Sequence, residues 1–426
     1  MPVQVGVIGA GVVGGGVIEI LMRNREVLKT NTGADIVLSH ICELNADNLK
    51  SFDLNSVSVT DDAAVLINNP KIDVVCELIG GIEPAKSFTL SALNAGKHVV
   101  TANKMLVAYH GPELAEAATK NNLHYRYEAA VAGGIPIIKA LREGLAANNI
   151  QFLYGILNGT CNYVLSRMTY DDMDFDTALQ QAQEAGFAET PPDLDIDGHD
   201  TAHKCQILAS LCYASPVEVE DIPVEGIADI TRSDVAYASE MGYVIKLLAI
   251  VSRDNGAIDA RVHPTLVPKD HLLASVRNEF NAIYVQGDMA DATLYYGKGA
   301  GRLPTASAVI ADIADIAQRH GAPATPPFTY THALPLRDIG ELRSRYYLRL
   351  TTRDDPGVLG TVCTLLGDHG VSIASCIQND PHGEDSVHVV MMTHETVESS
   401  LRAALSTIDG LDVVNEPTHV IRMLEE

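Results

Sequence analysis

The sequence has no tryptophan and few basic residues. Its 426 residues include 30 Lys and Arg against 55 Asp and Glu, which gives a formal net charge of −25. A field of that sign repels nucleic acid and anionic membranes, and no basic stripe with interleaved aromatic residues breaks the pattern. We therefore expect neither a nucleic-acid partner nor a membrane partner.

Long apolar runs and paired cysteines are also missing. No apolar run approaches the roughly 20 residues that span a bilayer. The N-terminal stretch MPVQVGVIGAG has no basic segment before its apolar run, which argues against a signal peptide and favours a cytoplasmic protein. The seven cysteines are odd in number and have no CxxC spacing, which is typical of reduced thiols rather than a disulfide framework or a zinc site.

The composition, with 46% hydrophobic and 20% charged residues, is typical of a globular protein. The length of the chain is sufficient for several domains. In residues 1–130, apolar runs alternate with amphipathic stretches, and we expect strands at 3–8, 36–43, 74–78, 98–101 and 124–128. Strands that alternate with helices predict a Rossmann-type, doubly wound parallel sheet. A helix in residues 301–320 is expected to return to this domain.

The pattern changes twice after residue 130. Residues 131–300 mix longer helices with strands and predict an α+β substrate-binding domain. Residues 321–345 are rich in proline and turn residues, which is typical of a linker. Residues 346–426 predict the order βαββαβ, a self-contained ferredoxin-like module.

A glycine-rich turn lies between the first strand and the first helix. Its pattern is G-x-G-x-x-G, and the residues expected to face the cofactor are Gly9, Gly11, Val12, Val13 and Gly14. The glycines permit a tight turn and backbone access to a pyrophosphate, while the helix N-terminus supplies free N–H groups. Glu43 ends the second strand, where an acid can accept hydrogen bonds from ribose hydroxyls and disfavours a 2′-phosphate. The alternatives are a tight turn that binds nothing and a solvated glutamate.

Residues 184–204 concentrate acids around one lysine. Asp200 and Lys204 are four residues apart and share a helix face, so the carboxylate keeps the lysine protonated and able to donate a proton to a developing alkoxide. Glu189 and Asp195 lie in the same stretch. A solvated acidic turn with one helix ion pair is the alternative, whereas a calcium site does not fit because the spacing is not that of an EF-hand.

Three further segments suit ligand contact. Lys104 follows a strand at the edge of the sheet where ligands bind in open α/β folds, although an ordinary surface lysine is the alternative. The stretch 158–163, NGTCNY, opens a helix with small polar residues, or is simply a helix cap. Glu128 begins a glycine-rich bend at 128–136 that can turn oxygens towards a hard cation, or serves only as a strand-to-helix hinge.

These segments together resemble the homoserine dehydrogenase family over nearly the whole chain. The resemblance is carried by the glycine-rich turn, TANK at 101–104, EAAVAGGIP at 128–136, NGTCNY at 158–163, the stretch 184–204 and GKGAGRLPTASAV at 297–309. It implies the interconversion of aspartate 4-semialdehyde and L-homoserine with NAD or NADP, on the shared route to threonine and methionine.

The resemblance also implies roles for individual residues. Lys204 would donate the proton, Lys104 would contact cofactor and substrate, and Gly301 would approach the cofactor. Glu189, Asp195 and Asp200 would hold the substrate's amino group and hydroxyl. A monovalent cation, usually sodium in the family, would bind at Glu128, Val131, Gly133 and Ile135, three of them through backbone carbonyls.

Two positions depart from the family pattern. Pro191 stands where the family usually has an aspartate, and Cys42-Glu43 stands where many members carry a basic residue for NADP. Glu43 therefore favours NAD, although residues alone leave both cofactors open.

The C-terminal module resembles an ACT domain through DDPGVLG at 354–360. ACT domains commonly pair and bind amino acids at the pair interface, which implies a homodimer or homotetramer and feedback by threonine. A module that only oligomerises is the alternative. Two other whole-chain alternatives are a different Rossmann-plus-ACT dehydrogenase, disfavoured because the phosphate loop begins at residue 9, and an amino-acid sensor built on an inactive dehydrogenase.

Overall fold

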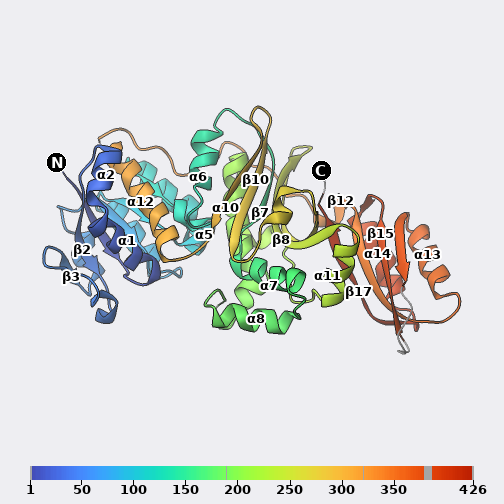
Figure 1. Cartoon of the computed structure of the whole chain (residues 1–426). Helices are drawn as coiled ribbons and strands as arrows, with labels where there is room; N and C mark the ends of the chain where they lie inside the picture. The colour runs from blue at the N-terminus through green and yellow to red at the C-terminus, as the bar shows by residue number, and fades with distance from the viewer. Residues whose placement is uncertain (1, 189, 320, 379–385, 425–426) are drawn as a thin grey trace.

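The computed structural model describes residues 2–188, 190–319, 321–378 and 386–424. Figure 1 shows three parts in a row, with the N-terminal sheet at one end, a second layered region in the middle and the C-terminal module at the other end.

The N-terminal part is a six-stranded parallel sheet in the order β3-β2-β1-β4-β5-β6. Its strands are β1 (Val3–Ile8), β2 (Ile36–Cys42), β3 (Ser58–Thr60), β4 (Val74–Glu77), β5 (His98–Thr101) and β6 (Tyr125–Arg126). The order reverses direction at β1 and β4, which is the doubly wound arrangement, so the predicted fold class is confirmed. Of these six strands, only the short edge strand β3 was not expected from the sequence.

Helices cover both faces of this sheet. They are α1 (Val12–Arg23), α2 (Arg25–Thr32), α3 (Ala63–Ile67), α4 (Ala85–Asn94), α5 (Lys104–Lys120) and the late helix α12 (Arg302–Gln318). One core joins β1 to α1 and α12, while α3, α4 and α5 pack on the other face. The close approach of α12 depends on Gly16, where a Cβ would lie 2.5 Å from the Arg302 carbonyl oxygen.

The middle part is built on a long mixed sheet in the order β11-β10-β7-β8-β9-β17-β13-β15-β14. Its own strands are β7 (Ile150–Ile156), β8 (Tyr243–Asp254), β9 (Ala257–Pro268), β10 (Phe280–Gly287) and β11 (Asp291–Lys298). The helices are α6 (Ile137–Lys139), α7 (Gly159–Tyr170), α8 (Phe175–Glu184), α9 (Asp193–Ile196), α10 (His199–Tyr213) and α11 (Arg232–Glu240). Helix α10 packs on β8 and β9 and so carries its residues between this sheet and the N-terminal part.

The C-terminal part has the predicted βαββαβ order, and its ACT fold is confirmed. It comprises β13 (Tyr346–Arg353), α13 (Val358–Asp368), β14 (Ile373–Gln378), β15 (Ser386–Thr393), α14 (Glu398–Ile408) and β17 (Val414–Met423), with a small ribbon of β12 (Arg343–Ser344) and β16 (Thr396–Val397). The module has its own core, but β17 also pairs in parallel with β9 through Arg422–Thr265 and Met423–Leu266. The ACT sheet is therefore continuous with the sheet of the middle part, which the sequence did not predict.

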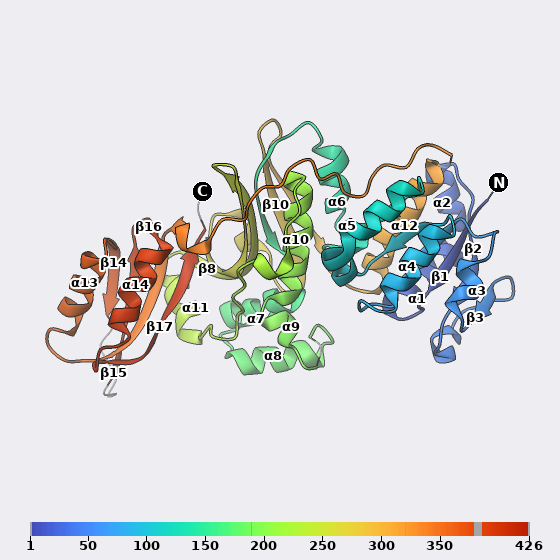
Figure 2. The same ribbon diagram turned by 180° about the vertical axis from the view of Figure 1, so that it is seen from behind.

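The segment predicted as a linker runs along the outside of the first two parts (Figure 2). Phe328 stacks on Tyr127 with ring centroids 4.9 Å apart, and the Tyr127 hydroxyl donates to the Pro327 carbonyl at 2.9 Å. Leu336 then forms a bridge with Ile258 beside β9. The segment is thus packed against the domains it connects. Single turns of 3-10 or π helix lie at Ala46–Leu49, Glu128–Ala130, Ala140–Gly144, Val219–Asp221, Leu272–Ser275 and Ile339–Glu341.

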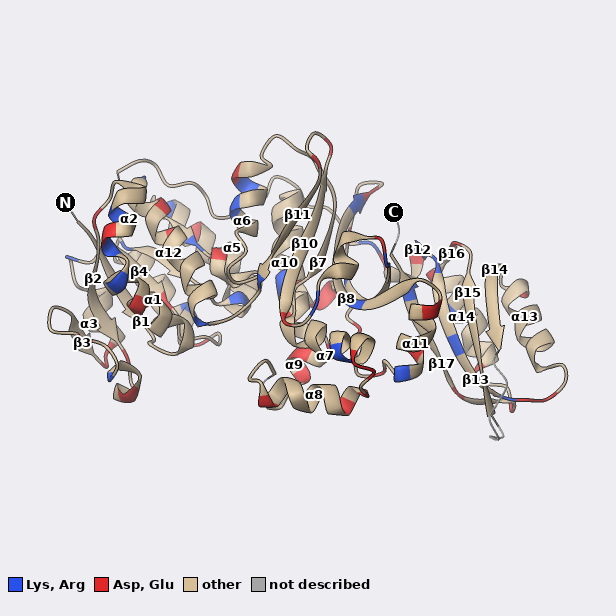
Figure 3. Cartoon of the chain, viewed as in Figure 1, with Lys and Arg blue, Asp and Glu red and all other residues tan. Residues whose placement is uncertain are grey.

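Two global features bear on the sequence-based expectations. All seven cysteines are free thiols, and none of the described helices is both long and apolar enough to cross a membrane. Acidic residues are spread over all three parts with Lys and Arg between them (Figure 3).

Candidate active site

The glycine-rich turn forms a tight loop between β1 and α1. Gly9 has φ +91°, and a Cβ at Gly14 would lie 1.9 Å from the Gly9 carbonyl oxygen, so both positions require glycine. Nothing lies within 4 Å of a Cβ built on Gly11, and α1 has no side-chain cap. The loop therefore presents a bare helix N-terminus to open space, which fits a nucleotide phosphate.

Glu43 lies against this loop, as its place at the end of β2 predicts. Its carboxylate accepts a hydrogen bond from the Ala10 N–H and a second, at 2.8 Å, from the Asn45 N–H. The cation Lys50 is exposed and paired with Asp47 at 2.6 Å. A carboxylate is thus fixed against the backbone at the end of β1, while Lys50 pairs elsewhere.

Arg302 is a cation near the loop that sequence reasoning missed. It follows Gly301, which has φ +119°, at the start of α12. Its guanidinium forms an ion pair with Glu19 and donates to the Gly15 carbonyl oxygen at 3.2 Å. The sequence offers one signal for this cation, an arginine directly after the glycine-rich run 297–301. It does not reveal the contact with Gly15, which lies 287 residues away in the chain.

A cavity of about 700 Å³ lies between the N-terminal and middle parts. The structure brings together six of the predicted site residues from distant segments in its lining: Lys104, Gly133, Asp195, Asp200, Lys204 and Gly301. Pro191, the position that departs from the family pattern, lines the same cavity. The predicted substrate residue Glu189 lies outside the described residues.

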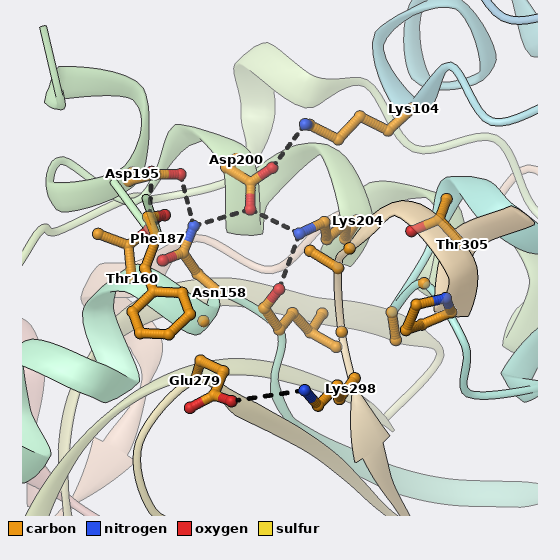
Figure 4. Close-up of a pocket in the computed structure, with 18 of the residues that line it drawn as sticks. Lys104, Asn158, Thr160, Phe187, Asp195, Asp200, Lys204, Glu279, Lys298 and Thr305 are labelled. Atoms are coloured by element: carbon orange, nitrogen blue, oxygen red, sulfur yellow. Dashed lines mark hydrogen bonds and ion pairs between the residues drawn. The ribbon is translucent and has the colours of Figure 1, made fainter. Parts of the chain in front are cut away.

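At the centre of the cavity wall, two lysines hold one carboxylate (Figure 4). Lys204 Nζ lies 2.6 Å from Asp200 Oδ2, and Lys104 Nζ lies 2.8 Å from Asp200 Oδ1. Lys204 also donates to the Leu157 carbonyl oxygen at 2.7 Å. Burial raises the pKa of Asp200, but the two ammonium groups outweigh it and hold that pKa below its ordinary value. Asp200 is therefore a carboxylate at neutral pH.

Local sequence explains how the three charges meet. The Asn103 side chain caps α5 by accepting from the Leu106 N–H at 3.1 Å, which places Lys104 in the first helical turn beyond β5. Helix α10 begins after Gly198, which has φ +86°, and presents Asp200 and Lys204 one turn apart. The lysine side chains differ in exposure, at 11% for Lys204 and 39% for Lys104.

Asn158 and Thr160 complete the cluster. Asn158 caps α7 with its side-chain oxygen, while its Nδ2 donates to Asp195 at 2.7 Å and to Asp200 at 2.9 Å. Thr160 Oγ1 lies 2.9 Å from Asp195 Oδ2 and 2.7 Å from the Phe187 carbonyl oxygen. The NGTCNY segment is thus both a helix cap and part of the site, because the cap's amide group faces the two acids.

The bend at 128–136 lies beside the cavity, and Gly133 lines it. Glu128 is buried, and its two carboxylate oxygens accept from the N–H groups of Ile138 and Lys139, each at 2.8 Å. Burial and the nearby Asp312 carboxylate raise the pKa of Glu128 to about 7. A Cβ on Gly133, at φ +51°, would lie 2.5 Å from the Gly299 carbonyl oxygen, so this bend and the 297–301 loop touch.

No cluster of three His, Cys, Asp or Glu side chains suited to a metal ion occurs among the described residues. Any cation at the bend would therefore depend on backbone carbonyls in addition to Glu128. Val131 and Ile135 are buried in the same bend.

Comparison with known proteins gives the same family along the whole chain. Residues 136–314 match the family model described as homoserine dehydrogenase, residues 9–128 match the homoserine dehydrogenase NAD-binding domain, and residues 346–412 match the ACT domain. A curated homoserine dehydrogenase of Neisseria gonorrhoeae is 42% identical over 99% of this chain and 98% of that protein. One of Synechocystis is 42% identical over 100% of both chains. A crystal structure of a homoserine dehydrogenase from Thiobacillus denitrificans has a TM-score of 0.94 and 42% identity, and covers 100% of this chain and 99% of that one.

Proposed function

The chain belongs to the homoserine dehydrogenase family, an NAD(P)-dependent group of oxidoreductases, and we propose that it interconverts L-aspartate 4-semialdehyde and L-homoserine. The observation that carries the proposal is the Lys204 side chain, which donates to Asp200 and to the Leu157 carbonyl and lines the cavity between the N-terminal and middle parts. Arg302 also lines this cavity and donates to the Gly15 carbonyl oxygen of α1.

The nicotinamide, when bound, supplies the hydride that reaches the carbonyl carbon of the aldehyde. Lys204 donates a proton to the carbonyl oxygen, and the product is an alcohol. Asp200, ionised at neutral pH, holds the Lys204 Nζ 2.6 Å from its Oδ2, so the proposed donor is positioned before the substrate arrives. In the reverse direction Lys204 accepts the hydroxyl proton.

Substrate binding is assigned to the acids around the cavity. We propose that the substrate's ammonium group binds Asp195 and its hydroxyl lies near Asp200, because both carboxylates line the cavity and can accept hydrogen bonds. By similarity to the family, Glu189 would also bind the ammonium group. Asn158 and Thr160 orient Asp195 from one side. We assign Lys104, whose side chain is more exposed than that of Lys204, to contact with both cofactor and substrate.

For the cofactor, we propose that Gly9, Gly11, Val12, Val13 and Gly14 surround the phosphates and that Gly301 approaches the cofactor. Glu43 would accept hydrogen bonds from the adenosine ribose and repel a 2′-phosphate, so we propose a preference for NAD over NADP. The Glu43→Ala protein should lose part of that preference. An unchanged ratio of kcat/KM for the two cofactors would remove the role of Glu43.

A monovalent cation, sodium by similarity, is proposed at Glu128, Val131, Gly133 and Ile135. A carboxylate has about four acceptor sites, so Glu128 can contact a cation while it holds the two N–H groups of α6. Sodium chloride should raise the Tm more than choline chloride at equal ionic strength, and Glu128→Gln should abolish the difference. Equal Tm values in the two salts would contradict the site.

We further propose that the reaction serves threonine and methionine synthesis in the cytoplasm, and that threonine inhibits it through the ACT domain of a homodimer or homotetramer. The ACT fold supports regulation by an amino acid, and the seven free thiols suit a reducing compartment.

The direct test is homoserine oxidation with NAD and with NADP, each with and without threonine. Lys204→Ala should lower kcat on the order of 10²–10⁴-fold, because it removes the general acid–base group. Lys86→Met, which removes a lysine paired with Glu113 away from the cavity, is the matched control. Near-normal turnover by Lys204→Ala would end the assignment, and threonine binding without any turnover by the native protein would end the proposed activity.

A further inference from the structure

A buried acid, Glu77, ends β4 at the carboxyl edge of the parallel sheet. Its partners in the described part of the chain are a hydroxyl and a backbone N–H rather than a cation. Oε2 accepts from Thr101 Oγ1 at 2.7 Å, and Oε1 accepts from the Ile79 N–H at 3.0 Å. Burial raises the pKa of Glu77, and these hydrogen bonds oppose the rise only in part. A carboxyl group buried without a cation is costly compared with an apolar side chain, which points to a role beyond packing.

The Thr101 hydroxyl extends the contacts of Glu77 to the start of α5. Thr101 lies opposite Glu77 on the adjacent strand β5, and its Oγ1 also accepts from the Asn103 N–H at 3.0 Å. Asn103 Oδ1 caps α5 by accepting from the Leu106 N–H, while Asn103 Nδ2 donates to the Gly81 carbonyl oxygen at 2.5 Å. We call Glu77, Thr101, Asn103 and Gly81 the edge network. It runs from the end of β4 through the end of β5 and back to the loop that follows β4.

The edge network holds two segments that border the site. The first is loop 78–81, which lies against the phosphate loop, because a Cβ built on Gly9 would lie 2.9 Å from the Leu78 carbonyl oxygen. The second is the first turn of α5, from which Lys104 Nζ reaches Asp200 at 2.8 Å (Figure 4). The network therefore links a neighbour of the phosphate loop to the lysine pair of the active-site cavity.

The position of loop 78–81 suits the nicotinamide half of a dinucleotide. A dinucleotide on a doubly wound sheet crosses the carboxyl ends of the strands at the switch point, here between β1 and β4. The phosphate loop and Glu43 belong to the β1–β2 side, where the adenosine half is proposed to bind. Loop 78–81 and residues 101–104 belong to the β4–β5 side. Gly80 and Gly81 have φ +76° and +70°, and no described atom lies within 4 Å of a Cβ built on either, so the loop has room for a ligand beside it.

We propose that Glu77 is a positioning residue for the nicotinamide half of the cofactor. Through Thr101 and Asn103 it fixes loop 78–81 relative to Lys104, so that both segments are in place before the cofactor binds. The inference rests on the proposed function, because it divides the binding of that enzyme's cofactor between the two sides of the switch point. Breaking the edge network should therefore weaken the binding of NADH but not that of ADP, which lacks the nicotinamide and its ribose.

The test is titration of the full-length protein with NADH, followed by the fluorescence of the cofactor, and with ADP, followed by calorimetry. NADPH replaces NADH if the native protein binds it more tightly. Glu77→Gln removes one of the two acceptor oxygens, and Thr101→Val removes the hydroxyl but keeps the shape of the side chain. Each should weaken NADH binding on the order of tenfold, as expected for a lost hydrogen bond, while the affinity for ADP stays within about twofold of native. Thr101→Ser restores the hydroxyl and should bind NADH with native affinity.

Asn103→Asp provides a second route if the buried substitutions impair folding. Asp is as good a helix cap as Asn, but it faces the Gly81 carbonyl with an oxygen in place of a donor. This variant should also weaken NADH binding and leave ADP binding intact. Thr89→Val is the matched control, because Thr89 is buried in α4 and its Oγ1 has no hydrogen-bond partner among the described residues. It should keep native affinity for both ligands and native turnover.

Two results would overturn the role of Glu77. Equal losses of NADH and ADP affinity in Glu77→Gln and Thr101→Val would show that the edge network only holds the domain together. Native NADH affinity in both variants would show that the network does not position the cofactor. Homoserine oxidation by the native protein tests the proposed activity separately. Its absence, with NADH binding intact, would end that activity and leave the role of Glu77 in cofactor binding standing.

Discussion

Two buried aspartates hold clusters of donors in this molecule, and they serve different ends. Asp200 lies in the wall of the active-site cavity and contacts Lys104 and Lys204. Asp234, on α11, accepts from the Tyr347 hydroxyl at 2.9 Å and from Arg349 Nε at 2.7 Å, both from the ACT domain. Both acids are buried, but only Asp200 adjoins a space that a ligand can enter.

The pKa values of the two acids shift in the same direction for related reasons. Burial raises both pKa values, but neighbouring donors outweigh it. The donors are Lys204 and Lys104 at Asp200, and His419 and Arg349 at Asp234. Because each folded-state pKa lies below the unfolded value, each acid stabilises the fold at neutral pH and loses that contribution as the pH falls through the folded value. The same electrostatics thus holds two lysine side chains on one carboxylate at the cavity and fastens two domains at Asp234.

The largest effect is expected on stability, at the domain junction. Asp234→Ala leaves the Arg349 guanidinium buried without its main partner and should lower the free energy of unfolding by about 3–5 kcal/mol. Urea unfolding, followed by far-UV circular dichroism, measures this. Turnover by the folded variant should stay close to native, since Asp234 does not line the active-site cavity. A loss under about 1 kcal/mol would mean that solvent or another group replaces the carboxylate.

The second effect is expected on activity, in the cavity. Asp200→Asn keeps the shape but removes the charge that pairs with Lys204, the proposed proton donor, so kcat should fall on the order of 10²-fold. A change in the lower limb of the pH–rate profile would report a chemical effect, whereas a change in the midpoint of unfolding would report a folding defect. A variant with native kcat and only a raised KM would show that Asp200 binds substrate without supporting the proton donor.

A buried lysine without an acidic partner in the described part of the chain, Lys246, extends the comparison. Lys246 Nζ contacts Asn162 Oδ1 at 2.9 Å and the Val276 carbonyl oxygen, and it forms no ion pair within the described part of the chain. Burial lowers its pKa to about 7, with Arg277 adding to the effect. Between that pKa and the unfolded value near 10.5, the unfolded state binds more protons, so stability should rise with pH by up to about 1.4 kcal/mol per unit.

Lys246→Met should flatten this rise, which unfolding midpoints at pH 7 and pH 9 would reveal. Lys269→Met, on an exposed lysine that contacts Ser239, is the control and should leave the slope unchanged. A native slope in Lys246→Met would mean that the ammonium stays charged inside the fold.

Sequence alone predicted the parts of the site that depend on local spacing. Asp200 and Lys204 share a helix face because they are four residues apart, and Lys104 lines the cavity because it opens the helix that follows β5. The β-α alternation likewise predicted the parallel sheet, and the βαββαβ order predicted the ACT domain. Each of these inferences needs only the residues within one or two elements.

The remainder depends on contacts between distant segments. Asn158 joins Asp195 and Asp200 only because α7 and α10 pack side by side, and Arg302 reaches Gly15 only because α12 returns to α1. The pairing of β17 with β9 is likewise absent from any local pattern. Such contacts are fixed by how whole elements pack, so neighbouring residues carry no signal for them.

The smallest effect on stability is expected at the helix cap that holds Asp234. Thr231 and Asp234 form a capping box at the start of α11, in which Thr231 accepts from the Asp234 N–H and Asp234 accepts from the Thr231 N–H at 2.9 Å. Thr231→Ala should cost about 1 kcal/mol, like Asp174→Ala at the exposed cap of α8. Thr231 also orients the carboxylate that binds Arg349, so Thr231→Ala and Asp234→Ala together should cost less than the sum of the two alone. Strict additivity would show that the cap and the interdomain contact are independent, and that the ACT domain is held by Asp234 whatever happens to the helix end.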